Sequence, residues 1–161
     1  MYSYKSFTPQ NTFQLASKLG TKLKGGEVIA LEGELGAGKT QFVKGLADGL
    51  EAKELVTSPT FTLLHLYEGR ITLAHFDVYR LPSFEAFEEL GYEEYFEGAG
   101  VTAIEWSDLI KPYLPSEYIL VKIQHIYEQD KGEGRLITFY PQGKLMEALI
   151  KELEKDDCFR N

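Results

Sequence analysis

The sequence has one cysteine and no long hydrophobic segment. Cys158 stands alone in a polar C-terminal stretch, which excludes an internal disulfide and a cysteine-based zinc site. No apolar run approaches the length of a membrane-spanning helix, and no basic segment precedes an apolar one at the N-terminus. We therefore expect a cytoplasmic protein that neither enters a membrane nor is secreted.

Arginine and positive charge are also scarce. The formal net charge is −8, and 13 lysines accompany only four arginines, at positions 70, 80, 135 and 160. Proteins that hold nucleic acid by its phosphate backbone rely on clustered Lys and Arg, so this chain is poorly suited to hold it unaided. A small-molecule kinase would need cationic lid residues near the transferred phosphoryl group, and four scattered arginines fit that requirement poorly.

What remains is typical of a compact globular protein. The 161 residues are 43% hydrophobic and 26% charged, which is ordinary for such proteins. We find no linker, repeat or low-complexity segment, and the length predicts a single domain over residues 1–161 with a frayed tail at 156–161.

The strongest motif lies at residues 33–40, which read Gly-Glu-Leu-Gly-Ala-Gly-Lys-Thr. This is the phosphate-loop pattern of Gly, four residues and Gly-Lys-Thr. The apolar run 28–31 before it predicts a buried strand, and residues 41–50 after it have apolar side chains at helical spacing. A strand, a glycine loop and a helix are the three parts that phosphate binding needs.

Each residue type in this loop has a chemical reason. Gly36 and Gly38 let the backbone turn so that N–H groups face phosphate oxygens, and the following helix adds its positive N-terminus. Lys39 supplies a mobile charge for the β- and γ-phosphates, and the Thr40 hydroxyl can ligate Mg²⁺. We therefore predict a nucleoside triphosphate site at this loop.

Two carboxylates follow apolar runs further along the chain. Asp77 ends the run at 70–76 and Glu105 ends the run at 101–104. Ligand groups gather at the carboxyl ends of parallel strands, so Glu105 lies beside Thr40 if its strand runs parallel to 28–31. Asp77 stands where nucleotidases place the carboxylate that meets the metal or its water, but a strand-end aspartate can equally cap the next turn. Trp106 is either a packing residue or a base-stacking platform.

A hydroxyl-rich stretch occupies residues 57–61 and includes Ser58, Pro59 and Thr60. Pro59 disfavours helix before it, so the stretch is expected to be an extended loop. Such a loop can act as a switch that touches the phosphate or metal. On the residues alone, a polar turn that leads into the next strand is the simpler interpretation.

The other segments predict an α/β protein. Helices are expected at 10–23, at 83–95 with Phe84, Phe87 and Leu90 inward, and at 144–154 with Leu145, Leu149 and Leu153 inward. Strands are expected at 61–67, 70–76, 118–126 and 135–140. The last two strands are expected to pair antiparallel around a loop at 128–134. His65, His75 and His125 show no metal-ligand spacing, and we interpret them as ordinary strand or edge residues.

The loop leaves the nucleotide's fate open. No Asn-Lys-x-Asp motif for guanine is present, so ATP is favoured. A slow ATPase fits best because Thr40 accompanies two strand-end carboxylates. The alternatives are a phosphotransferase whose stretch at 57–60 handles an acceptor, and a nucleotide-sensing subunit that docks a basic partner on its acidic residues 85–97. A charged helix face of this kind is more often simply solvated.

Four motifs in order resemble the TsaE (formerly YjeE) family. They are residues 33–40, Ser-Pro-Thr-Phe at 58–61, His-Phe-Asp-Val-Tyr-Arg at 75–80, and Glu-Trp at 105–106. Their order, spacing and the chain length agree over nearly the whole sequence. One departure is Gln41, where many members have a second threonine. We expect the residue at this position to modulate contact with the phosphate.

This resemblance implies a single P-loop NTPase-like α/β domain with a mixed parallel and antiparallel sheet flanked by helices. It implies that Thr40 and Glu105 hold Mg²⁺, that Asp77 is needed for hydrolysis, and that the segment Ser58–Phe61 is a switch. Our mechanistic hypothesis assigns catalytic roles to Asp77, Lys39 and Glu105. The resemblance suggests residues 7–10 as neighbours of the adenine. The implied contacts to ATP or ADP come from Gly33, Glu34, Leu35, Gly36, Ala37, Gly38, Lys39, Thr40, Gln41 and Thr60.

The resemblance also implies a cellular role. The family is the bacterial ATPase needed to form N6-threonylcarbamoyladenosine at position 37 of tRNAs that read codons beginning with A. Its partners are the TsaD and TsaB subunits, of which TsaD performs the transfer while ATP hydrolysis resets the complex. Contact with tRNA would then be indirect, in keeping with the acidic composition.

Overall fold

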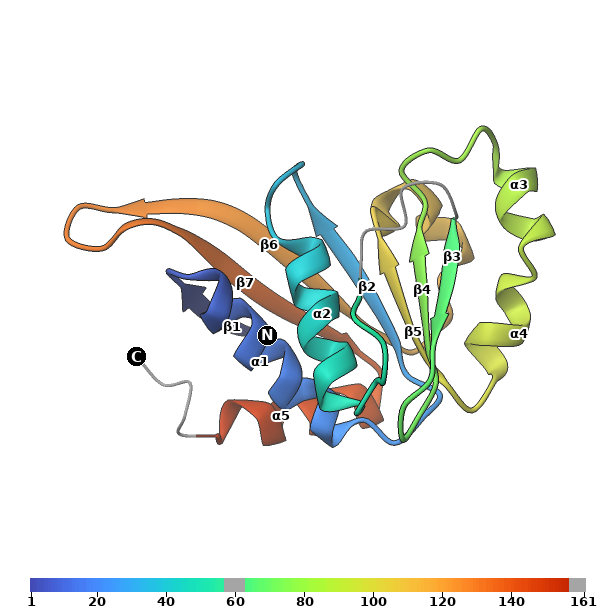
Figure 1. Ribbon diagram of the computed structural model, residues 1–161, viewed down its shortest axis with the longest axis horizontal. Coiled ribbons are helices and arrows are strands. Elements are labelled where there is room, and N and C mark those ends of the chain that lie inside the picture. The colour runs from blue at the N-terminus through green and yellow to red at the C-terminus, as the bar shows by residue number, and fades with distance from the viewer. Residues whose placement is uncertain (57–62, 157–161) are drawn as a thin grey trace.

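The computed structural model describes residues 1–56 and 63–156. In this part of the chain, seven strands form one sheet in the order β1-β7-β6-β2-β5-β4-β3 (Figure 1). The strands are β1 (Tyr2–Ser6), β2 (Val28–Gly33), β3 (Leu64–Tyr67), β4 (Leu73–Asp77), β5 (Val101–Glu105), β6 (Tyr118–Glu128) and β7 (Gly132–Gln142). The helices are α1 (Pro9–Lys22), α2 (Lys39–Gly49), α3 (Phe84–Glu89), α4 (Tyr92–Glu97) and α5 (Lys144–Glu154), with a 3₁₀ segment η1 (Ser107–Tyr113).

The centre of the sheet is parallel and its borders are antiparallel. β2 runs parallel to both β5 and β6, and β4 runs parallel to β5. β3 pairs antiparallel with β4, β7 with β6, and β1 with β7. The mixed α/β fold expected from the sequence is confirmed, as is the antiparallel pairing of β6 with β7. The strand of Glu105 does run parallel to the strand before the phosphate loop, which was the condition for placing Glu105 beside Thr40.

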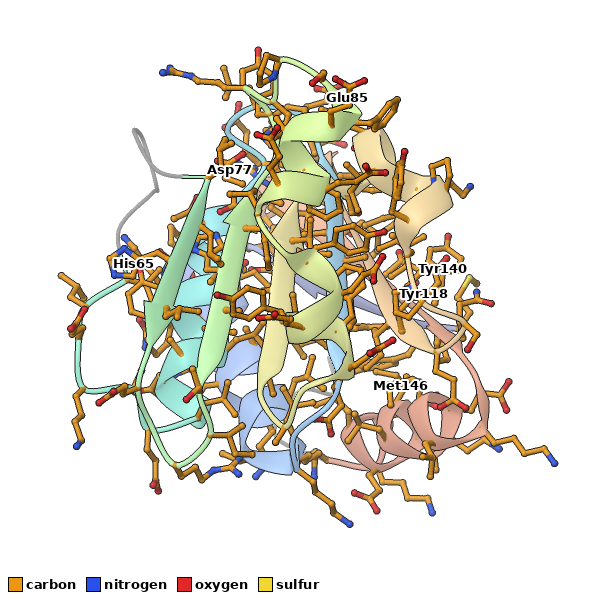
Figure 2. The ribbon with its side chains drawn as sticks, turned by 90° about the vertical axis from the view of Figure 1, so that its right-hand side faces the viewer. His65, Asp77, Glu85, Tyr118, Tyr140 and Met146 are labelled. Atoms are coloured by element: carbon orange, nitrogen blue, oxygen red, sulfur yellow. The ribbon has the colours of Figure 1, made fainter. Side chains whose placement is uncertain are left out.

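Helices cover both faces of the sheet (Figures 1 and 2). On one face, α1, α2 and α5 bury residues such as Leu15, Phe42 and Ile150 against the strands. On the other face, α3, α4 and η1 enclose a smaller core with Phe76 and Phe87 at its centre. Side chains alternate between the two faces along a strand. Phe76 of β4 therefore packs in the smaller core, and its neighbours His75 and Asp77 lie on the face that α2 covers.

The helix that begins at the phosphate loop is packed tightly against α1. A Cβ placed on Gly45 of α2 would lie 2.3 Å from the carbonyl oxygen of Phe13, and one on Gly49 would lie 2.2 Å from that of Ser17. The two helices therefore touch backbone to backbone. This contact fixes where α2, and with it Lys39 and Thr40, stands above the sheet.

Several details differ from the expectations. β1 extends the sheet by pairing with β7, which the sequence did not indicate, and β6 and β7 are longer than expected, so that their loop is shorter than 128–134. The helix expected at 83–95 is two short helices, because Gly91 adopts a left-handed conformation with φ 71° between them. Phe84 and Leu145, expected to point inward, are 51% and 71% exposed.

Within the described residues, no helix combines the length and apolar character needed to cross a membrane.

Candidate nucleotide and metal site

The phosphate loop joins β2 to α2 at the carboxyl end of the parallel strands. Gly36 and Gly38 have φ values of 78° and 109°, a region that only glycine enters without strain. α2 then begins at Lys39, so the loop's amide groups and the helix N-terminus converge. Leu35, at the tip, is 79% exposed. The predicted strand, loop and helix are all present.

Lys39 is folded back into this loop. Its Nζ donates to the carbonyl oxygen of Glu34 at 2.9 Å and to that of Gly33, and it lies 3.8 Å from the centre of the Trp106 ring. Burial lowers the pKa of Lys39, while the nearby carboxylates, Glu105 foremost, oppose that shift. The ammonium group thus lies among weak acceptors that a phosphate can replace.

Thr40 and Glu105 are in direct contact. The Thr40 hydroxyl donates to the two carboxylate oxygens of Glu105 at 3.0 and 3.3 Å. Glu105 is only 3% exposed. The contact arises because β5 lies beside β2 in parallel register, so that the end of β5 faces the start of α2. The sequence-based placement of Glu105 at the same edge as Thr40 is correct.

Asp77 ends β4 directly opposite Glu105 in the register of β4 and β5, and it stands at the edge of the sheet away from Met146 of α5 (Figure 2). Its Oδ1 accepts a hydrogen bond from the Tyr79 N–H at 3.1 Å. Burial raises the pKa of Asp77, and the charge of Glu105 adds to that rise. The Tyr79 N–H and the charges of His75 and Lys39 oppose it. Asp77 therefore both caps its turn and faces the site.

The oxygen donors here suit a small, hard cation. A hydroxyl and a carboxylate lie within 3.0 Å of each other at the loop, and Mg²⁺ prefers such oxygen ligands. In the described part of the chain, no group of three or more His, Cys, Asp or Glu could hold a metal by itself. Magnesium commonly takes one or two protein ligands and completes its shell with water and substrate phosphates, so these residues fit it.

Arg135 of β7 was not predicted as a site residue. Its Nε donates to the carbonyl oxygen of Ala37 at 2.9 Å, and its Nη2 donates to that of Gly36 at 3.2 Å. The guanidinium thus ties the back of the phosphate loop to the antiparallel part of the sheet. No local pattern marks this residue, because the contact joins positions almost a hundred residues apart.

His75 is the second residue that the sequence interpretation missed. It lies in a strand as expected, but its Nε2 hydrogen-bonds to Glu105 Oε2 at 2.5 Å in the interior of the protein. A signal was available, because His75 is two residues before Asp77 and must share its face of the strand.

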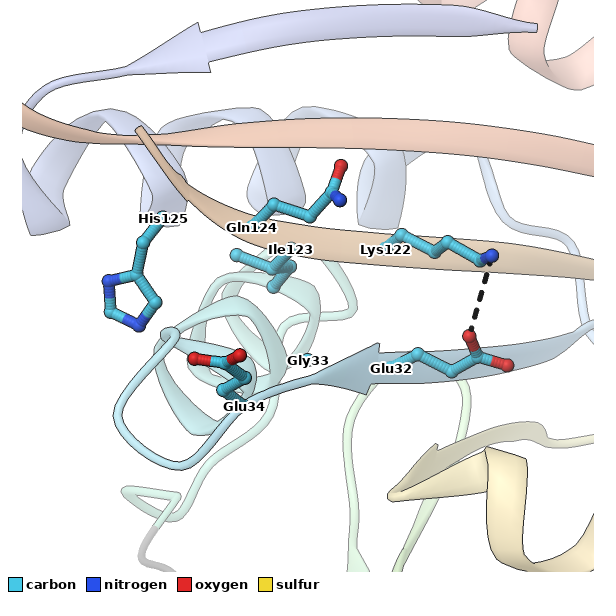
Figure 3. A pocket seen from close by; sticks show the side chains of 7 residues that line it. All are labelled: Glu32, Gly33, Glu34, Lys122, Ile123, Gln124 and His125. Atoms are coloured by element: carbon cyan, nitrogen blue, oxygen red, sulfur yellow. Dashed lines mark ion pairs between the residues drawn. The ribbon is translucent and has the colours of Figure 1, made fainter. Parts of the chain in front are cut away.

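A pocket of about 360 Å³ opens beside the loop, between the end of β2 and the middle of β6 (Figure 3). Glu32 and Lys122 form an ion pair of 3.8 Å at one side, and Glu34 and His125 lie at the other.

Gln41, at the start of α2, donates from its side chain to the carbonyl oxygen of Pro9 at 3.2 Å. This contact brings residues 7–10 to the beginning of α2.

The structure thus brings the loop 33–40, Gln41, Asp77 and Glu105 to one edge of the sheet. The remaining predicted contact, Thr60, and the switch at 58–61 lie outside the described residues.

This fold and site define a P-loop NTPase-like α/β domain. The family model described as "Threonylcarbamoyl adenosine biosynthesis protein TsaE" matches residues 6–135. The chain belongs to this TsaE family.

Relatives agree with that assignment. The protein named tRNA threonylcarbamoyladenosine biosynthesis protein TsaE from Bacillus subtilis (strain 168) is 40% identical over 159 residues, covering 98% of this chain and 97% of the relative. The protein of that name from Treponema pallidum (strain Nichols) is 46% identical over 119 residues, covering 74% and 88%. The crystal structure of Bacillus subtilis YdiB superposes with a TM-score of 0.81 at 37% identity, covering 97% of this chain and 95% of that one.

Proposed function

We propose that this protein is a magnesium-dependent ATPase that supports formation of N6-threonylcarbamoyladenosine at position 37 of tRNAs. Membership of the TsaE family supports the pathway. The observation that carries the chemistry is the contact of Thr40 with the buried Glu105 at the phosphate loop. A loop that only bound phosphate would not need a buried carboxylate there.

In this proposal the loop amides and Lys39 hold the triphosphate of ATP. Lys39 now donates to the carbonyl oxygens of Gly33 and Glu34, and phosphate oxygens are stronger acceptors because they are charged. The ammonium group then offsets the charge that develops on the leaving phosphate.

Thr40 and Glu105 would hold Mg²⁺, which when bound offsets charge on the β- and γ-phosphates. Asp77 orients or activates the attacking water, because it is a carboxylate on the neighbouring strand, level with Glu105. Burial, and after it the charge of Glu105, raise the pKa of Asp77, which favours uptake of a proton by this carboxylate.

The partners in this proposal are TsaD and TsaB, with hydrolysis resetting their complex while TsaD performs the transfer. The acidic composition, with net charge −8, supports contact with tRNA through those partners in preference to direct binding. The acidic side chains of α3 and α4, such as Glu85 (Figure 2), are exposed to solvent.

The fate of a labelled γ-phosphate tests the reaction class. We expect the purified protein with [γ-³²P]ATP and Mg²⁺ to release free phosphate slowly, and EDTA to stop the release. Label on a small metabolite would instead favour the phosphotransferase. No turnover even with TsaB, TsaD and tRNA would favour the sensing subunit.

A further inference from the structure

His75 is a fully buried polar side chain beside the site. It is 0% exposed and stands in β4, where it shares a face with Asp77 and Leu73. That face is the one covered by α2. A buried imidazole has lost its hydrogen bonds to water, and this loss is destabilising unless a contact within the protein replaces them.

The compensating contact is with Glu105. His75 Nε2 lies 2.5 Å from Glu105 Oε2, and a proton must lie between these atoms because two lone pairs would repel each other. The Thr40 hydroxyl lies nearer to the other oxygen, Oε1, at 3.0 Å. The two carboxylate oxygens of Glu105 therefore have different main partners. His75 contacts Oε2 from inside the protein, and Oε1 faces Thr40 at the phosphate loop.

The second nitrogen of His75 shows what this arrangement costs. Nδ1 is buried and has no hydrogen-bond partner within the described part of the chain, and a buried unpaired polar atom is destabilising. An apolar side chain at this position would avoid the loss. The imidazole is thus not explained by packing alone, and its contribution lies at Nε2.

We propose that His75 is a positioning residue for the cation site. Its Nε2–H fixes the rotation of the Glu105 carboxylate, so that Oε1 stays directed at Thr40 where Mg²⁺ would be held. His75 itself touches neither the cation nor the nucleotide. This inference rests on the proposed binding of ATP with Mg²⁺ at Thr40 and Glu105.

Three variants isolate this role. His75→Leu removes the donor and keeps an apolar side chain of similar size. His75→Gln places an amide N–H near the position of Nε2 and should restore the contact. His65→Leu is the matched control, because His65 pairs with His75 in the register of β3 and β4 but contacts Glu54 and Tyr67 in place of Glu105.

The measurement is binding of a fluorescent ATP analogue during a Mg²⁺ titration, repeated in EDTA. For His75→Leu we expect the half-saturating Mg²⁺ concentration to rise about 10–100-fold, the range for residues that orient metal ligands. Binding in EDTA should stay within about twofold of wild type, which shows an intact phosphate loop. His75→Gln should recover most of the Mg²⁺ response, and His65→Leu should match wild type.

A double variant separates positioning from general damage. In a Glu105→Gln background, His75→Leu should add almost nothing to the Mg²⁺ requirement, because its effect passes through the carboxylate. If His75→Leu does not fold, His75→Asn replaces it, since its shorter amide does not reach Glu105. A folded variant with a wild-type Mg²⁺ requirement would overturn the inference. A wild-type protein whose ATP binding ignores Mg²⁺ would instead overturn the proposed function.

Discussion

Single residues in this site carry charge that the protein has partly removed from water. Lys39 and Glu105 are 5% and 3% exposed, and both have polar partners that a nucleotide or cation can exchange or join. Burial shifts the pKa values of Lys39 and Asp77 in the direction that disfavours their charged forms. The burial of these groups thus carries an electrostatic cost that binding of phosphate and cation would relieve.

Replacing Asp77 by asparagine tests its role in hydrolysis. The substitution keeps the shape and an oxygen that can accept from the Tyr79 N–H, but it removes the basic carboxylate. We expect ATP binding to stay within about twofold of wild type. Turnover should fall by about 100-fold or more, which is the usual size of a general-base contribution. A variant that hydrolyses ATP at the wild-type rate would remove Asp77 from the mechanism.

The same substitution has a consequence for stability. The pKa of Asp77 is raised in the folded protein, chiefly by burial, so the folded state binds more protons than the unfolded state between the ordinary and the raised value. Stability of the wild type therefore falls as pH rises through that range. In EDTA without nucleotide, we expect Asp77→Asn to melt at a higher temperature than wild type at pH 7.

This advantage of Asp77→Asn should shrink as the pH falls through the acidic range, because the wild-type carboxyl then becomes protonated in both states. Melting curves from pH 7 to pH 4 measure it. An advantage that grows on acidification would mean that Asp77 is stabilised in its charged form.

At the residue scale the sequence indicated those chemical groups that follow a local pattern. Lys39 and Thr40 belong to a contiguous motif, and Asp77 and Glu105 each end an apolar strand. His75 had a weaker signal, its position two residues before Asp77 on the same face of β4, and its role became visible only through the contact with Glu105.

Among the elements, α2 and β7 determine where the phosphate loop stands. α2 is held against α1 by close backbone contact at Gly45 and Gly49. β7 reaches the loop through Arg135, whose guanidinium binds two loop carbonyl groups. The loop is thus supported from the helix that follows it and from a strand distant in sequence.

Replacing Arg135 by alanine should loosen the loop without touching a phosphate-binding group. Loss of charge-assisted hydrogen bonds to the carbonyl oxygens of Gly36 and Ala37 should weaken ATP binding about tenfold. Arg135→Lys should restore it only in part, because an ammonium group lacks the fork that reaches both acceptors. Calorimetric or fluorescence titration with ATP measures the effect.

Arg70→Ala is the matched control for this experiment. Arg70 also donates to backbone carbonyl oxygens, those of Gly20 and Leu23 at the end of α1 and that of Gly49 at the end of α2, away from the loop. We expect this variant to lower the melting temperature and to leave ATP affinity unchanged. Equal ATP affinity in wild type and folded Arg135→Ala would contradict the supporting role of β7.

The elements themselves were predictable where periodicity is strong. The helix expected at 144–154 has those bounds, and the strand before the loop and its helix were expected within two residues of their observed ends. The helix at 83–95 was misjudged because its apolar spacing continues through Gly91, whose left-handed backbone divides it. The sequence did not predict β1, because this five-residue segment becomes a strand only through its pairing with the distant β7.

In the whole molecule, the strand order creates the site. Asp77, Glu105 and the phosphate loop come from three segments, and they meet because β4, β5 and β2 are parallel neighbours. The sequence left the parallel pairing of β2 and β5 as a condition and did not predict the seven-strand order, since pairing over long separations leaves no local pattern. The long β6–β7 hairpin extends away from the rest of the sheet (Figure 1).

ATP hydrolysis by the purified protein, measured alone and then with TsaB, TsaD and tRNA, is the decisive test of the proposed function. Asp77→Asn under the same conditions serves as the background. We expect slow, Mg²⁺-dependent turnover by the protein alone, a severalfold rise with the partners, and loss of turnover in the variant. Turnover that ignores the partners would contradict the link to tRNA modification, and turnover that persists in Asp77→Asn would contradict the assigned chemistry.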